Sequence, residues 1–130
     1  MKKNRGFTLI EILVVVAVVA IIAAVAWPSY QAQLRKGRRA DAQAFMMDLS
    51  NREQAYLLDQ RSYATGAGAL SSLNVTVPST VSPYYAVAIA AGPAVPGFTI
   101  TATPSGIQAA DGALTLDSSG QKTRNGVSGW

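Results

Sequence analysis

Hydrophobic residues are most concentrated near the start of the chain, over residues 7–27, and polar residues become frequent only afterwards. As an α-helix this stretch would be about 31 Å long at 1.5 Å per residue, which matches a bilayer hydrocarbon core of about 30 Å. Glu11 is the only charged residue between Arg5 and Arg35. A carboxylate inside a bilayer costs about 2.5–3.5 kcal/mol, so it is expected to have a partner or a task. The pattern predicts a helix that can cross a membrane once.

A second, amphipathic pattern follows over residues 28–61. Pro28 removes one amide donor, but no strong turn signal interrupts the pattern after it, so we expect the helix to continue. Apolar residues at three- and four-residue spacings predict the buried face: Ala42, Phe45, Met46, Leu49, Tyr56 and Leu57. Charged residues are assigned to the opposite, solvated face: Asp41, Asp48, Arg52, Glu53 and Asp59.

Residues 62–130 have the composition of loops and short strands. Ser, Thr, Gly and Pro predict a long surface loop over residues 62–83 with one short extended piece. Alternating apolar residues predict strands over residues 84–91, 98–103 and 113–117, with a possible fourth over 121–124. The expected fold class is therefore α+β: one long N-terminal α-helix packed on a three- to four-stranded antiparallel β-sheet.

The composition removes several kinds of chemistry. The 130 residues include no histidine and no cysteine, which excludes the commonest general base, thiolate metal sites and disulfides. We expect neither an enzyme nor a cofactor or metal site. The net charge of +4 comes largely from Lys2, Lys3 and Arg5, and from Phe7 onward eight basic residues face seven acidic ones.

A basic cluster remains beyond the apolar stretch, formed by Arg35, Lys36, Arg38 and Arg39. Such a cluster is more typical of a solvated or headgroup-facing helix surface than of a nucleic-acid contact. The basic residues that precede the apolar stretch favour a cytoplasmic N-terminus, with the chain from Pro28 onward outside.

Two ordinary alternatives fit the apolar stretch less well. A secretory signal peptide could be cut at Ala24-Val25-Ala26, but its apolar core is usually about 7–15 residues long. A plain single-span anchor is the other alternative. Neither one explains Glu11.

The string Gly6-Phe7-Thr8-Leu9-Ile10-Glu11, directly after a basic leader, resembles the class III signal of type IV pilins and pseudopilins. The resemblance implies that a prepilin peptidase cuts between Gly6 and Phe7 and methylates the amino group of Phe7. It also implies that Glu11 pairs with the N-terminal amine of a neighbouring subunit. Further segments, 84–85, 98–104 and 111–117, are similar to the C-terminal half of minor pilins of the PilE type.

The resemblance implies a type IV pilin fold and a division of the chain into four parts. These are a leader peptide (1–6), a transmembrane and filament-core helix (7–27), its amphipathic continuation (28–61), and the αβ-loop with the sheet of a globular head (62–130). The protein would be a structural, minor subunit of a type IV pilus that supports pilus biogenesis, adhesion, twitching motility or DNA uptake. It would be stored in the bacterial inner membrane and then extracted by an assembly platform into an extracellular filament with other pilins.

Two related functions stay open. A type II secretion pseudopilin shares the N-terminus, but its major form carries an acidic calcium loop, for which Asp111 and Asp117 alone are thin support. A DNA-binding uptake pilin would use basic residues on the outer head, and the set here is sparse: Arg52, Arg61, Lys122 and Arg124. Without cysteines, the region after Asp117 would be held by strand pairing and by burial of apolar groups, including Trp130.

Overall fold

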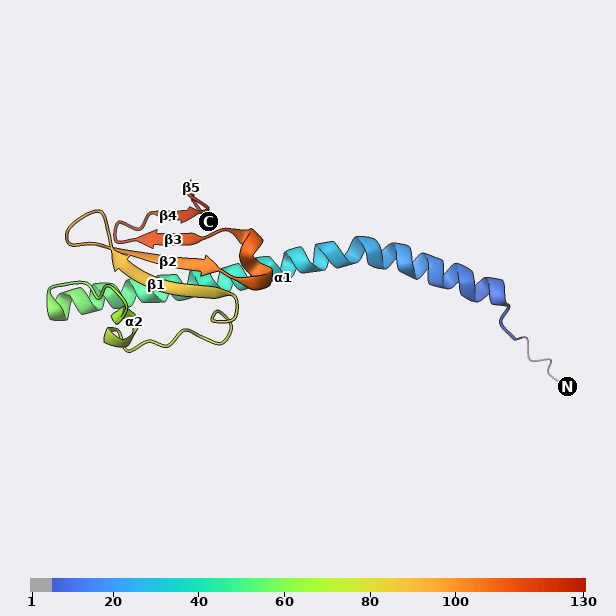
Figure 1. The fold of residues 1–130 in the computed structure, drawn as a ribbon, viewed down its shortest axis with the longest axis horizontal. Helices are drawn as coiled ribbons and strands as arrows, with labels where there is room; N and C mark the ends of the chain where they lie inside the picture. The colour runs from blue at the N-terminus through green and yellow to red at the C-terminus, as the bar shows by residue number, and fades with distance from the viewer. Residues whose placement is uncertain (1–5) are drawn as a thin grey trace. The chain divides into compact units, whose positions relative to one another are not determined.

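The computed structural model describes residues 6–130, which form two compact units, one ending at Leu34 and one covering Arg35–Trp130. Helix α1 contributes to both units (Figure 1). The elements, in chain order, are α1 (Leu9–Gln60), α2 (Ala69–Ser72), β1 (Tyr85–Ala91), β2 (Phe98–Pro104), the 3-10 helix η1 (Gly106–Asp111), β3 (Leu114–Asp117), β4 (Lys122–Arg124) and β5 (Val127–Ser128). The expected α+β class is confirmed.

Helix α1 continues through Pro28, as the sequence predicts. Within residues 6–34 the first unit has only this helix and no second layer, so its apolar side chains from Phe7 to Tyr30 are exposed. The second unit buries one face of α1, and that face carries Ala42, Phe45, Met46 and Leu49. The predicted amphipathic face is therefore confirmed at these four positions.

The sheet is antiparallel, and its strands follow one another in chain order, β1-β2-β3-β4-β5. The expectation of three to four strands was one short, because β5 pairs with β4 across Arg124 and Val127. Asn125 and Gly126 form the two-residue turn between them, with φ of 52° and 79°. Two positive φ values in such a turn favour a tight hairpin, and Asn-Gly is the dipeptide most suited to it.

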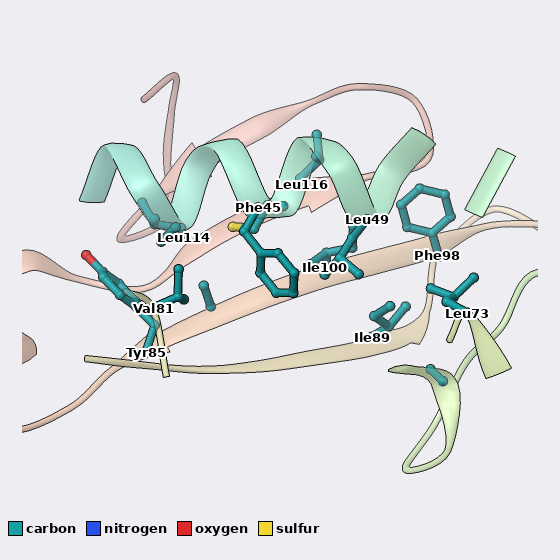
Figure 2. Close-up of a cluster of buried hydrophobic side chains, with 14 of the residues drawn as sticks. Phe45, Leu49, Leu73, Val81, Tyr85, Ile89, Phe98, Ile100, Leu114 and Leu116 are labelled. Carbon is teal, nitrogen blue, oxygen red and sulfur yellow. The ribbon is translucent and has the colours of Figure 1, made fainter. Parts of the chain in front are cut away.

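The core of the second unit lies between α1, the sheet and the 61–84 segment. Figure 2 shows Phe45 and Leu49 directed from α1 toward the strand that carries Ile100. The Tyr63 ring meets the Phe98 ring edge to face at 4.9 Å between centroids. Buried residues of all three parts form one cluster: Ala42, Phe45, Met46, Leu49, Ala64, Ala69, Leu73, Val81, Tyr85, Ile89, Phe98, Ile100, Ala102, Leu114 and Leu116.

Two local expectations were wrong. The 62–83 segment contains the short helix α2 and no strand, where one short extended piece was expected. The connection between β2 and β3 contains η1. Glu53 does not lie on the solvated face, because its side chain is 0% exposed. Its Oε2 accepts a hydrogen bond from the backbone N–H of Ala64 at 2.9 Å, so it fastens the segment after α1 to the helix.

The C-terminal residues are held as the sequence predicts for a chain without cysteines. Strands β3, β4 and β5 pair in succession, and Trp130 is partly buried against the core. Its indole N–H donates to the Thr115 carbonyl at 3.2 Å, which closes the end of the chain onto β3.

Candidate functional site

The sequence-predicted site residues Gly6, Phe7 and Glu11 lie around the first turn of α1. Residues 6–8 precede the helix in irregular conformation, and the three site residues, with Thr8, line an open cleft of about 420 Å³. The Phe7 side chain is 82% exposed. The bond between Gly6 and Phe7 is therefore in an accessible segment immediately before a regular helix.

Packing within the chain does not require glycine at position 6. A Cβ built on Gly6 meets no atom within 4 Å among the described residues, and its φ lies outside the left-handed region. Glycine is usually explained by a tight approach or a positive φ. Neither applies here, so any requirement for a small residue must come from a molecule that binds this segment.

Thr8 is a functional candidate that the sequence reasoning missed. Its Oγ1 accepts a hydrogen bond from the Glu11 backbone N–H at 3.3 Å, and its carbonyl accepts one from Ile12 at 3.4 Å. Thr8 is therefore the N-cap of α1 and Glu11 its third residue, the spacing of a capping box. The pattern Thr-x-x-Glu was the available signal.

The Glu11 carboxylate is near the N-terminal end of the helix, where the helix dipole favours a negative charge. Within residues 6–130 its side chain forms no ion pair and no hydrogen bond to another side chain. The cap thus fixes the backbone at Glu11 and leaves the carboxylate available to a group from outside the chain.

The surface around this site is apolar over many residues. Large hydrophobic side chains from Phe7 to Tyr30 are about half to four-fifths exposed, among them Trp27 at 67% and Tyr30 at 60%. The helix is long and apolar enough to cross a membrane, and none of its apolar window is buried in the chain itself. So large an exposed apolar surface is unusual for a protein that remains monomeric in water.

A second polar site lies in the Arg35–Trp130 unit and is built around Asp111, whose side chain is 7% exposed. Asp111 Oδ1 forms an ion pair with the Arg39 guanidinium at 3.2 Å, and the hydroxyl of Tyr85 donates a hydrogen bond to Oδ2 at 2.8 Å. Gln108 donates to the Tyr85 hydroxyl and to the Arg35 carbonyl, both at 3.0 Å. This network ties η1 to both α1 and β1, so its role is structural.

The network also changes the acidity of Tyr85. Burial, followed by the hydrogen bond to Asp111, raises the pKa of Tyr85 to about 12. The Tyr85 hydroxyl therefore remains a donor at any physiological pH. No local sequence pattern indicated this network, because its members come from three separate elements, α1, β1 and η1.

The basic residues are less available than the sequence suggested. Arg52 pairs with Asp48 at 2.8 Å, and Arg124 lies 4.0 Å from Asp111. The Lys122 ammonium lies 4.8 Å from the centre of the Trp130 ring. Of the outer set named above, Arg61 alone has neither an ion pair nor an aromatic contact within the described chain.

The two carboxylates considered for calcium are both engaged by protein donors. Asp111 has the contacts given above, and Asp117 Oδ1 accepts hydrogen bonds from Ser119 N, Ser119 Oγ and Gln121 N. The Ser119 hydroxyl is the main cause that lowers the pKa of Asp117. Asp117 therefore stabilises the turn between β3 and β4.

Two family descriptions match the chain. "Prokaryotic N-terminal methylation motif" matches residues 1–27, and "Type IV minor pilin ComP, DNA uptake sequence receptor" matches residues 28–116. Together they cover most of the chain.

Two curated proteins are similar in sequence. The "Type IV wide pilus major component PilA4" of Thermus thermophilus is 32% identical over 83 residues, and the chain spans only 63% of that relative's length. The "Prepilin peptidase-dependent protein D" of Escherichia coli is 29% identical over 130 residues, which are 100% of this chain and 82% of the relative.

A solved type IV pilin from Shewanella oneidensis shares the fold. Its TM-score is 0.53 at 24% sequence identity, over 68% of this chain and 90% of that one. At this identity the similarity concerns the fold alone.

Proposed function

This chain belongs to the family of minor type IV pilins, and we propose that it is cut between Gly6 and Phe7 and methylated at Phe7 before it is assembled. The proposal is supported by the accessible segment before α1 and by the free space around Gly6. It also agrees with the methylation motif over residues 1–27. A prepilin peptidase and an inner-membrane assembly platform are the partners that this processing needs.

Before assembly, the helix over residues 7–27 anchors the protein in the inner membrane, with its N-terminus in the cytoplasm and the head, residues 62–130, outside. The observation that carries the proposal is the exposed apolar surface of this helix, none of which is buried in the described chain. Lipid tails cover such a surface in the membrane, and other helices cover it in a filament. Because both surroundings are apolar, one sequence can serve in both, and the small side chains among its residues permit close helix packing.

In the filament, Glu11 pairs with the methylated amine of Phe7 on a neighbouring subunit. The carboxylate forms no side-chain contact in the described chain, and the Thr8 cap holds its backbone in place. A charge pair is much stronger in an apolar core than in water, whereas a carboxylate left unpaired there is strongly destabilising. The pair therefore selects the axial register at which subunits dock.

The test compares Glu11→Ala with Asp59→Ala, an exposed carboxylate on the same helix. Glu11→Ala should leave cleavage and membrane insertion intact but reduce its share of sheared filaments at least tenfold, while Asp59→Ala should assemble normally. Intact mass shows whether the mature chain begins at a methylated Phe7. Normal incorporation of Glu11→Ala would remove the assembly role, and a mature chain that begins at Trp27 would remove the processing proposal.

A second function, reception of DNA by the head, is favoured by the description of the family that matches residues 28–116. Of the outer basic residues Arg52, Arg61, Lys122 and Arg124, only Arg61 and Lys122 lack an acidic partner in the described chain. Each phosphate contact that is lost should reduce the slope of log K against log salt by about 0.9. Arg61→Gln and Lys122→Gln should weaken DNA binding in a gel-shift assay, whereas Arg52→Gln, already paired with Asp48, should not. Equal binding by all three variants would count against this surface.

A further inference from the structure

The basic cluster after the apolar helix is divided in two by the structure. Arg39 pairs with Asp111, and the guanidinium of Arg38 lies 4.2 Å from the centre of the Tyr84 ring. Arg35 and Lys36 have neither kind of contact in the described chain. Two of the four cations thus belong to the packing of the head, and two are left for a partner.

The position of these two cations along α1 indicates which partner. Trp27 and Tyr30 are exposed aromatic residues at the end of the apolar stretch, where aromatic side chains mark the membrane–water interface. Arg35 follows Tyr30 by five residues, or about 7.5 Å of helix. The headgroup region adds about 5–8 Å to each side of the hydrocarbon core. With Tyr30 at the edge of the core, Arg35 therefore lies at the depth of the headgroups.

Side-chain direction brings the charges closer still. In an α-helix the Cα–Cβ bonds tilt toward the N-terminus, and long side chains follow that tilt by about one turn. Long side chains at positions 35 and 36 that follow this tilt would place their charged ends nearer the aromatic belt than their own Cα atoms. At that depth they would reach the headgroup layer, while their apolar stems lie along the helix.

We propose that Arg35 and Lys36 bind the phosphate groups of anionic phospholipids in the leaflet from which the head emerges. The inference rests on the proposed membrane anchoring. It adds that the stored subunit selects anionic over zwitterionic lipid and gives up these contacts when it is extracted. Each basic residue close to an anionic membrane surface strengthens the association by up to about fivefold.

The test uses the quenching of Trp27 fluorescence by brominated lipids. The mature full-length chain carrying Trp130→Phe, which leaves Trp27 as the single indole, is reconstituted into vesicles of phosphatidylcholine and phosphatidylglycerol. Bromines are placed on the chains of one lipid at a time. Brominated phosphatidylglycerol should quench Trp27 more strongly than brominated phosphatidylcholine, which corresponds to a several-fold preference for the anionic lipid. In 1 M NaCl this preference should disappear, because the Debye length falls to about 3 Å.

The variants separate this inference from its premise. Arg35→Gln with Lys36→Gln should bring the preference to unity, while Arg52→Gln, exposed further along the same helix, should leave it unchanged. Circular dichroism confirms that each variant is folded. Quenching by neither lipid would overturn the membrane anchoring itself. Equal quenching by both lipids in the parent chain, or a preference that survives in the double variant, would overturn this inference alone.

Discussion

Glu53 offers the sharpest test of how the head is held together. It is the one carboxylate that is fully buried among the described residues, and it joins α1 to the segment that leads into α2. Glu53→Ala leaves the Ala64 N–H without its acceptor. A buried donor that loses its partner costs about 1–3 kcal/mol, and the truncated side chain removes packing as well.

The pH dependence gives a second, independent signal from the same residue. Desolvation by burial raises the pKa of Glu53, and the hydrogen bond from Ala64 opposes this only in part. The stabilisation linked to the protonated carboxyl is complete below the unfolded pKa, near 4.5, and is lost as pH rises through the raised folded pKa. Glu53→Gln keeps an acceptor for Ala64 but cannot ionise, so its stability lacks this loss.

Urea denaturation of a fragment covering residues 29–130 measures both effects. With a slope of about 1.5 kcal/mol per molar, Glu53→Ala should lower the midpoint by about 1–2 M. The difference between the parent and Glu53→Gln should grow in favour of glutamine as pH is raised from about 4 to 7. Asp59→Asn, an exposed carboxylate on the same helix, controls for general charge effects. A parent and Glu53→Gln that keep a constant difference over this range would refute the reasoning.

Two further predictions concern the head. The 29–130 fragment should melt cooperatively as a monomer. Because it contains no cysteine, reducing agent should not change its melting temperature. Circular dichroism with and without reductant checks both points, and a non-cooperative melt would contradict the prediction. Asp117 has a lowered pKa, mainly because of the Ser119 hydroxyl, so it stabilises the fold above its unfolded pKa, near 3.8, and that contribution is lost as pH falls through the folded pKa. Asp117→Asn should therefore flatten the acid limb of the stability profile, and an unchanged limb in urea titrations between about pH 2 and 5 would argue against it.

The sequence was informative wherever a local repeat decides the structure. The apolar length of residues 7–27, the spacing that buries Phe45 and Leu49, and the alternation in β1 and β2 all depend on near neighbours. The Glu53 error came from giving residue type more weight than position. Ala42, Met46, Leu49 and Glu53 follow one another at spacings of four, three and four, so the helical period itself places Glu53 on the buried face.

What could not be predicted depends on contacts between distant segments. Gln108 is buried because its amide meets the Arg35 carbonyl and the Tyr85 hydroxyl, and residues 35 and 108 are 73 positions apart. Strand β5, by contrast, had a signal in Asn125-Gly126. Because Asn-Gly favours a two-residue hairpin turn, it predicts a strand in the segment that follows, even one of only two residues.

The distribution of charge also limits the order in which the proposed steps can occur. The rule that favours a cytoplasmic basic flank counts Lys and Arg within about 15–20 residues of the span. The leader supplies Lys2, Lys3 and Arg5, whereas four cations follow the apolar stretch over residues 35–39. Only in the folded head does Arg39 meet Asp111. Removing the leader first would take away the basic residues that favour a cytoplasmic N-terminus, so the charge bias supports insertion of the helix before the chain is cut.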